Sequence, residues 1–375
     1  MTHATATRAT WFQRFLLPGF AFKAVVIGGG YATGRELAEF FLRSGPQGGL
    51  LGMFLAMAIW SVICAGTFAL AHALSAYDYR TFFRGLLGRF WWLFEAAYLL
   101  FVVLILAVFG AAAGEIGRAL FGWPVIAGSI ALAVSIVTVV TFGNQAVEGL
   151  FKYVSILLYV VYAMFIVLAL TTFGDRIGEA LARRAPIDGW VTGGLTYASY
   201  NVVGAVVILP MIRHLTCRRD AVVAGLIAGP LAMVPALLFF VSMIAFYPGI
   251  EQQTLPSDYI LRRLDAPWFH LLFQAMIFAA LLESSVGSVH AINERIEAVL
   301  LERRGTALSA GARAMLASAV LVGCVFVADA IGLVTLIGSG YRFLAYIILA
   351  TYVVPLAAWW AGALVSGRSG AKVAG

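Results

Sequence analysis

The sequence predicts an all-α integral membrane protein with about ten transmembrane helices. Two observations predict this fold class. The chain is 62% hydrophobic and only 11% charged, and its mean hydropathy of +0.95 exceeds what soluble proteins show. Its apolar residues also fall into about ten runs, and a bilayer takes about 20 apolar residues per helix. These runs cover residues 15–42, 49–75, 91–117, 123–141, 149–173, 191–213, 220–247, 268–292, 312–328 and 341–364.

A hydrophilic stretch from Gly174 to Gly189 divides the runs into two sets of five. An odd number of spans per half inverts the second half relative to the first. Inverted repeats with a binding site at their interface are a recurrent transporter plan. We therefore expect a 5+5 inverted repeat, made of an N-terminal tail (1–14), a first repeat (15–173), an extracytoplasmic linker (174–190), a second repeat (191–364) and a C-terminal tail (365–375).

The 25 Lys and Arg residues predict the orientation of the chain. Fourteen of the 25 lie on the side of the N-terminus and seven on the opposite side. An even number of spans puts both termini on one side, and the positive-inside rule places that side in the cytoplasm. The same bias accounts for the net charge of +7, so no nucleic-acid partner is expected. The expected partners are a small-molecule substrate and the lipid bilayer, and nothing implies a protein partner.

The first span is interrupted by the sequence Gly-Gly-Gly-Tyr-Ala-Thr-Gly-Arg-Glu, residues 28 to 36. Each glycine costs about 1 kcal/mol relative to alanine in a helix. Unwound backbone at membrane depth is tolerated only where it is buried in protein or lines a polar cavity. The interruption therefore predicts a helix broken at mid-membrane, with a binding site at the break.

The residues after the glycines indicate how the helix restarts. Thr33 and Glu36 have the spacing of a capping box, and Arg35 and Glu39 lie four apart and can pair on one face. Glu36 is thus interpreted either as a cap or as a membrane-embedded carboxylate that binds a cation or a proton. Both interpretations hold only if Glu36 changes partner during a cycle.

An inverted repeat predicts a second broken helix in the sixth span. Polar and helix-weak residues occur there between Gly193 and Gly204, where an uninterrupted apolar run would have been possible. We expect the break within Ala198 to Gly204, with Ser199, Tyr200, Asn201 and Gly204 at the substrate.

The eighth span carries a polar stripe. Glu283, Gly287, His290, Glu294 and Glu297 recur at helical spacing, with Ser284 and Ser288 on a neighbouring face and Ser285 beside them. Such a face looks into the bundle or a water-filled cavity. The serines either line an ion site or return their hydroxyls to carbonyls of the preceding turn. Glu294 and Glu297 are expected in cytoplasmic water, whereas Glu283 lies well inside the span.

Lys152 lies a few residues inside the fifth span. Its ammonium either snorkels to the interface or stays buried and exchanges a proton in place of a bound sodium ion. Both interpretations remain open.

Catalytic and cofactor motifs are missing from the sequence. Cys64, Cys217 and Cys324 stand singly, without metal-ligand or disulfide spacing. The glycines of the first span do not match the dinucleotide pattern, and no Ser-His-Asp, Cys-His or paired-His spacing occurs. The sequence thus predicts no enzyme, no catalytic residue and no resident metal or cofactor.

The first-span motif, near Lys23, resembles the Gly-x-Gly-[Phe/Tyr]-Ala-[Ser/Thr]-Gly-x-Glu signature of YkvI-like bacterial membrane proteins. Five-plus-five spans with broken first and sixth helices look like the LeuT-type fold of the amino acid–polyamine–organocation superfamily. The resemblance implies the bacterial cytoplasmic (inner) membrane and a substrate site between the two breaks. It also implies a sodium site near Gly28, Ser284 and Ser288, which a fifth-span lysine replaces in proton-coupled relatives, as Lys152 would here.

The function expected is secondary active transport of a small organic solute, most simply an amino acid or a related amine, coupled to a proton or sodium gradient. Half-helix N-termini suit a substrate carboxylate, and glycines allow close backbone approach. The alternative is a passive channel for a small solute or ion. The candidate substrate-binding residues are Gly28, Gly29, Gly30, Tyr31, Thr33, Gly34, Ser199, Tyr200, Asn201 and Gly204, and the candidate coupling residues are Glu36, Lys152, Glu283, Ser284, Ser285 and Ser288.

Overall fold

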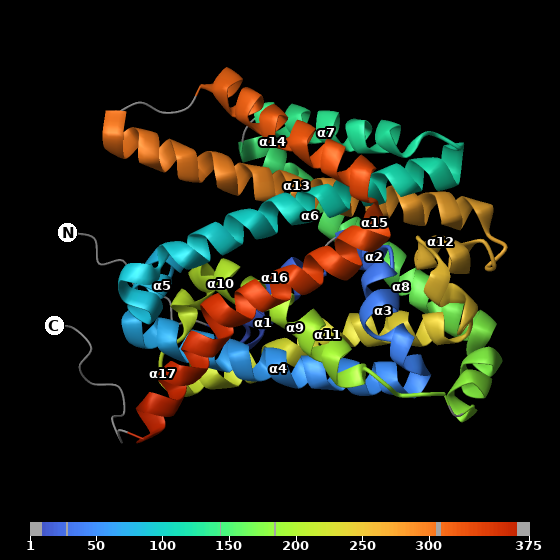
Figure 1. Cartoon of the computed structure of the whole chain (residues 1–375), viewed down its shortest axis with the longest axis horizontal. Helices are drawn as coiled ribbons and strands as arrows, with labels where there is room; N and C mark the ends of the chain where they lie inside the picture. The colour runs from blue at the N-terminus through green and yellow to red at the C-terminus, as the bar shows by residue number, and fades with distance from the viewer. Residues whose placement is uncertain (1–9, 28, 143, 184, 305–308, 366–375) are drawn as a thin grey trace.

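The computed structural model describes residues 10–27, 29–142, 144–183, 185–304 and 309–365. Within these ranges every regular element is a helix. Figure 1 shows a bundle with α5 and the end of α17 at one end and α12 at the opposite end. The predicted all-α fold class is confirmed.

The long helices are α4 (Gly45–Leu74), α6 (Trp92–Phe121), α7 (Val125–Phe142), α8 (Asn144–Ala182), α11 (Arg218–Ile244), α13 (Pro267–Arg304) and α14 (Ala310–Ile331). The last predicted span is built from α15 (Leu333–Thr335), η6 (Leu336–Gly340), α16 (Tyr341–Ile348), η7 (Leu349–Val353) and α17 (Val354–Val365). Two short elements, α5 (Tyr79–Leu87) and η3 (Gly88–Phe90), connect α4 to α6.

Seven helical stretches in the described residues are long and apolar enough to cross a membrane, and Val125–Thr141 is a shorter apolar helix. The two other predicted spans, 15–42 and 191–213, are divided into short helices, so length alone does not reveal them. The boundaries also differ from the prediction, because α8 continues to Ala182 instead of ending at residue 173.

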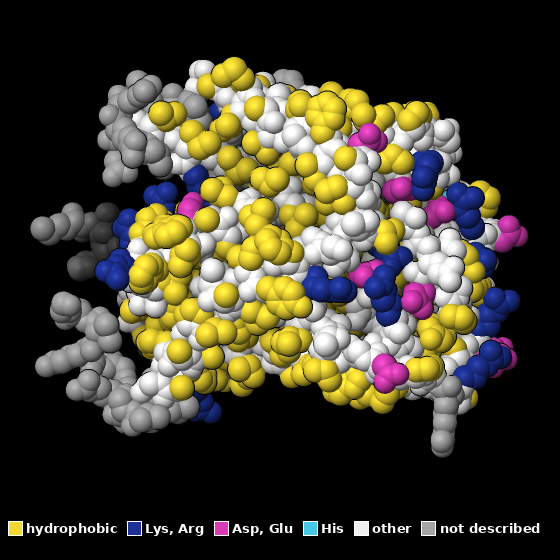
Figure 2. All heavy atoms as spheres, in the orientation of Figure 1, with side chains coloured by type: hydrophobic (Ala, Val, Ile, Leu, Met, Phe, Trp, Pro, Cys, Tyr) yellow, Lys and Arg dark blue, Asp and Glu magenta, His cyan; other side chains and the backbone are white. Residues whose placement is uncertain are grey.

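The outer surface between the two ends of the bundle is apolar. Large hydrophobic side chains such as Val134, Met315 and Phe326 are more than half exposed. Figure 2 shows hydrophobic side chains over the middle of this face, while most charged side chains gather toward the two ends. An exposed apolar belt of this extent is a lipid-facing surface.

The first span is interrupted where the glycines predicted. It consists of η1 (Phe12–Leu16), α1 (Leu17–Val26), α2 (Gly29–Ala32) and α3 (Arg35–Phe40), followed by η2 (Leu42–Ser44). Ile27 leaves the helical conformation with ψ 70°, and Gly34 adopts φ +78°. Two changes of backbone direction thus separate the helical arms.

The sixth span is interrupted more gently. It consists of α9 (Trp190–Asn201), α10 (Val203–Val207) and η4 (Leu209–His214). At the junction, the Ala205 amide bonds to the Val202 carbonyl at 2.9 Å, three residues back instead of four. This position agrees with the predicted range, although the break is a tightened turn and not an unwound loop.

Close helix packing places the two halves against each other. A Cβ at Gly225 of α11 would lie 2.6 Å from the carbonyl carbon of Cys64 in α4. A Cβ at Gly229 would lie 2.5 Å from the Met57 carbonyl oxygen. Small residues that let two backbones approach this closely are what hold helices together in lipid.

Candidate functional site

A buried arginine closes one side of the first-span break. Arg35 donates to Glu39 Oε2 at 2.9 Å, so the predicted pair is present, and it also donates to the carbonyls of Glu251 and Gln253, both at 2.9 Å. Arg43 approaches the same Glu39 oxygen at 2.6 Å. Because η5 (Gly249–Gln252) supplies one of these carbonyls, the network ties α3 to the connection between α11 and α13.

The short helix α12 (Pro256–Leu261) covers the break itself. The amide of Ser257 donates to the Thr33 carbonyl at 3.0 Å. Atoms of Phe239 and Pro256 lie 3.1 Å from the place a Cβ on Gly34 would take. This helix therefore acts as a lid over the break on the α3 side.

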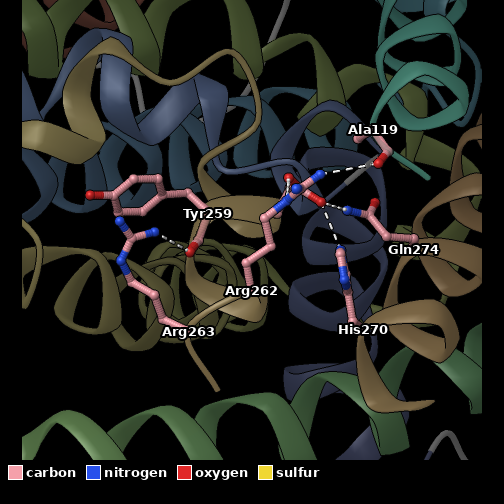
Figure 3. A network of polar contacts seen from close by, with 7 residues as sticks. Ala119, Tyr259, Arg262, Arg263, His270 and Gln274 are labelled. Carbon is pink, nitrogen blue, oxygen red and sulfur yellow. Dashed lines mark hydrogen bonds and ion pairs between the residues drawn. The ribbon is translucent and has the colours of Figure 1, made fainter. Parts of the chain in front are cut away.

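The lid is held by the carboxylate of Asp258. It accepts from Arg262 Nε at 2.7 Å and Gln274 Nε2 at 3.1 Å, and contacts His270 Nε2 at 2.7 Å. Figure 3 shows these three side chains converging, while Arg262 also reaches the Ala119 carbonyl at 3.0 Å. Burial opposes ionisation of Asp258, but the hydrogen bonds from His270 and Arg262 outweigh it and lower the pKa of this carboxyl below its ordinary value.

Asp258→Asn is expected to destabilise the protein at pH 7 by about 1–3 kcal/mol, because buried donors lose a charged acceptor. With a folded-state pKa below the unfolded value of about 3.9, the carboxylate's contribution is complete above pH 3.9 and is lost as the pH falls through the folded-state pKa. Melting temperatures of wild type and variant should therefore stay apart down to about pH 4 and converge as the pH falls further. The exposed Asp188 provides the control, since Asp188→Asn should change little. A pH-independent gap between Asp258→Asn and wild type would contradict the assignment.

Glu36 is buried but is not part of a capping box. Gly34 is the N-cap of α3 and makes no side-chain cap bond, and Thr33 Oγ1 accepts instead from the Arg35 amide at 3.2 Å. The Glu36 carboxylate accepts from the Tyr200 hydroxyl at 2.7 Å. The capping-box interpretation is therefore wrong, because a tyrosine from α9 takes the carboxylate away from its own helix.

Tyrosines from α2, α9 and α16 lie around this position, and Tyr162 of α8 contacts one of them. The Tyr200 ring lies 4.5 Å from that of Tyr341, centroid to centroid, and the Tyr31 and Tyr162 hydroxyls are 2.7 Å apart. The Tyr197 hydroxyl is buried with no hydrogen-bond partner in the described structure. Sequence reasoning named only Tyr31 and Tyr200. The signal for the others was weak, since a tyrosine in an apolar span indicates only that its hydroxyl finds a partner.

The remaining substrate candidates are mostly satisfied by their own helices. Ser199 Oγ donates to the Leu195 carbonyl at 2.6 Å, and Asn201 Nδ2 donates to the Tyr197 carbonyl at 3.0 Å. Gly204 allows α10 to approach α1, since a Cβ there would lie 3.1 Å from the Phe22 ring. Gly29 and Gly30 begin α2, and Gly28 lies outside the described residues.

A cavity of about 390 Å³ reaches the first-span break at Ile27 from the α1 side, with Val207 of α10 in its wall. Volumes of this order suit a small ligand. Its walls come from α1, α6, α8, α10 and α13. They include the predicted Glu283, Ser284 and Ser288, together with Lys23, Ile27, Tyr98, Phe101, Val102, Phe109, Tyr159, Val207 and Gly287.

The coupling candidates divide between this cavity and other places. Ser284 and Ser288 line the cavity beside Ile27, although Ser288 Oγ also donates to the Ser284 carbonyl at 2.9 Å. Ser285 does not line it and lies fully buried. Lys152 belongs to α8, and its side chain lies outside the described part of the structure.

Lys23 also lines this cavity. Sequence reasoning assigned this residue no role. Its ammonium nitrogen lies 4.1 Å from the centroid of the Tyr159 ring, a cation–π distance. Lys23 also lines a second cavity of about 320 Å³ against Pro235 and Tyr162. A lysine facing a cavity inside a membrane domain is a functional candidate. Its position within the apolar first span was the only signal in the sequence.

No family model matches the chain. In sequence, it is similar to the uncharacterized membrane protein YkvI of Bacillus subtilis (strain 168), with 22% identity over 284 residues that cover 75% of this chain and 80% of YkvI. In structure, it is similar to a Na⁺-coupled sialic acid symporter, with a TM-score of 0.59, 13% identity and coverage of 93% of this chain and 82% of that one. It is also similar to the manganese transporter of Eremococcus coleocola, with a TM-score of 0.53, 16% identity and coverage of 92% and 78%. The chain therefore has the LeuT-type fold and, over three quarters of its length, resembles the membrane protein YkvI.

Proposed function

We propose that this protein is a secondary active transporter of a small organic solute, an amino acid or related amine, that works by alternating access. The observation that carries the proposal is the asymmetry of the site. A cavity reaches the first-span break at Ile27 from the α1 side, with Val207 of α10 in its wall, whereas Arg35, Glu39 and the α12 lid cover that break from the α3 side. A site open to one side and closed to the other is what alternating access requires.

The alternative of a passive channel is less well supported. A channel needs one continuous polar path, whereas the cavity wall includes no residue of α3, where Arg35 and Glu39 form a buried ion pair. The two structural neighbours named above are transporters, which favours a carrier over a channel or an enzyme. A membrane location follows from the apolar helices. In the proposed orientation both termini are cytoplasmic in the bacterial inner membrane, so the cavity opens inward.

Counterflow in proteoliposomes tests the carrier. Purified protein is reconstituted with unlabelled solute inside, and labelled solute is added outside at low concentration. A carrier accumulates label transiently against its gradient. Each carrier that releases unlabelled solute outside binds labelled solute there and carries it inward. Simple equilibration, or a solute-dependent conductance without counterflow, would establish a channel instead.

Coupling to an ion is proposed at the cavity. If sodium binds there, we propose the Ile27 carbonyl and the Ser284 and Ser288 hydroxyls as oxygen ligands, because these residues line the cavity. Ser284→Ala with Ser288→Ala should then abolish sodium-stimulated uptake. If Lys152 carries a proton instead, wild-type uptake should follow a pH gradient without sodium. Lys152→Arg should then fail, because arginine does not release its proton at a pKa above 12.

Uptake measured at several imposed sodium and pH gradients distinguishes sodium coupling from proton coupling. Wild-type rates in Lys152→Arg together with sodium dependence would eliminate the proton-carrying lysine. Unchanged sodium stimulation in the serine double variant would eliminate the sodium site.

A further inference from the structure

Two buried glutamates on α3 have opposite surroundings. Glu36 and Glu39 lie one turn apart, and each is only 5% exposed. Glu39 is neutralised by two guanidinium groups, those of Arg35 at 2.9 Å and Arg43 at 2.6 Å. Glu36 accepts from the Tyr200 hydroxyl and forms no ion pair with any Lys or Arg of the described residues.

The groups that face Glu36 are phenols. Tyr31 of α2, Tyr197 and Tyr200 of α9 and Tyr341 of α16 all lie close enough to interact with its charge. All four are 2% exposed or less. The Tyr197 hydroxyl has no hydrogen-bond partner within the described ranges, so a buried oxygen near the carboxylate has an unused hydrogen-bonding capacity.

A carboxylate in this setting needs a positive partner. Burying an unpaired charge is expensive, and at membrane depth such groups mark functional sites. A multivalent metal ion fits poorly, because the described residues contain no group of three or more His, Cys, Asp or Glu side chains that could hold one. Aromatic faces around one carboxylate are instead the surroundings that bind an organic ammonium ion, through cation–π attraction and charge-assisted hydrogen bonds.

We infer that the ammonium group of the transported solute binds to Glu36 within the tyrosines Tyr31, Tyr197, Tyr200 and Tyr341. The inference rests on the proposed function and narrows the class of transported solutes. The solute must carry a protonated amine, whereas a carboxylate is optional. Tyr197 Oη supplies a further acceptor for an ammonium hydrogen.

The pH dependence distinguishes this role from proton cotransport. Without an ammonium ion, a proton on Glu36 is the other way to neutralise it, so protons and amines compete for one carboxylate. The facing tyrosines, with ordinary pKa values near 10, do not titrate between pH 5 and 8, and Arg35 stays bound to Glu39. Amine binding should therefore weaken toward acid pH, whereas binding with a cotransported proton on Glu36 would strengthen.

The test uses purified full-length protein in nanodiscs and pairs of compounds that differ in one amino group. The pairs are L-leucine with 4-methylpentanoate, butylamine with 1-butanol, and 2-phenylethylamine with 2-phenylethanol. Thermal shift and isothermal titration measure binding. At least one amino compound should bind at least tenfold more tightly than its partner, and its affinity should fall from pH 8 to pH 5. Glu36→Gln should lose at least tenfold of that affinity and the pH dependence.

Glu36→Gln retains an acceptor for the Tyr200 hydroxyl, so it should fold. The matched control is Glu115→Gln, because Glu115 pairs with Arg118 elsewhere on α6 and should bind amines as wild type does. Equal binding within every pair, an unaffected Glu36→Gln variant or stronger binding at acid pH would each overturn the inference. Counterflow of a solute without an amino group would overturn it too, while leaving the carrier intact.

Discussion

Gly225→Val is expected to abolish the folded protein or lower its free energy of unfolding by about 3 kcal/mol or more. Overpacking by itself costs about 1–3 kcal/mol. Here the added Cβ would meet the backbone of Cys64 and Ala65 in α4, not the tip of a flexible side chain. Backbone cannot rotate away, so α4 and α11 would have to separate along their length. Yield of monodisperse protein in detergent and its melting temperature measure the effect.

The matched control is the same substitution at Gly323 of α14, where no atom lies within 4 Å of the place a Cβ would take. Gly323→Val should leave yield and melting temperature nearly unchanged. If both variants behave alike, the close contact between α4 and α11 does not require a glycine at position 225.

Arg35→Ala is expected to open the α3 side of the site. Removing one partner of a buried ion pair costs about 3–5 kcal/mol, and here it also frees the carbonyls of Glu251 and Gln253. We expect the lid to separate from the first-span break. A cysteine introduced by Ser257→Cys, in a Cys217→Ser background, should then react faster with a membrane-impermeant maleimide.

The control for this variant is Arg43→Ala. Arg43 contacts the same Glu39, but its side chain is 50% exposed, and exposed pairs contribute only about 0–1 kcal/mol. It should change the labelling rate little. Equal rates in wild type and Arg35→Ala would show that Arg35 does not hold the lid.

Local rules in the sequence predicted much of the fold. Hydropathy identified the long spans, since burial in lipid requires apolar runs of a set length. The glycine run marked the first break, and helical spacing paired Arg35 with Glu39. The inverted repeat located the sixth break, at Val202, although it did not predict so gentle an interruption.

The site required contacts that sequence spacing does not encode. Glu36 and Tyr200 are 164 positions apart, so nothing local could decide between a cap and a buried carboxylate. Lys23 received no role from its pattern, yet in the folded chain its ammonium lies over the Tyr159 ring of α8 and faces the cavity.

The sequence by itself determined that this chain is a helical membrane protein with interrupted spans, because hydropathy and backbone propensity act over neighbouring residues. Only the tertiary structure decided the partner of Glu36. Glu39 pairs with Arg35 and Arg43, each four positions away in the sequence, whereas Glu36 on the same short helix meets Tyr200, because folding brings a segment 164 positions away against it.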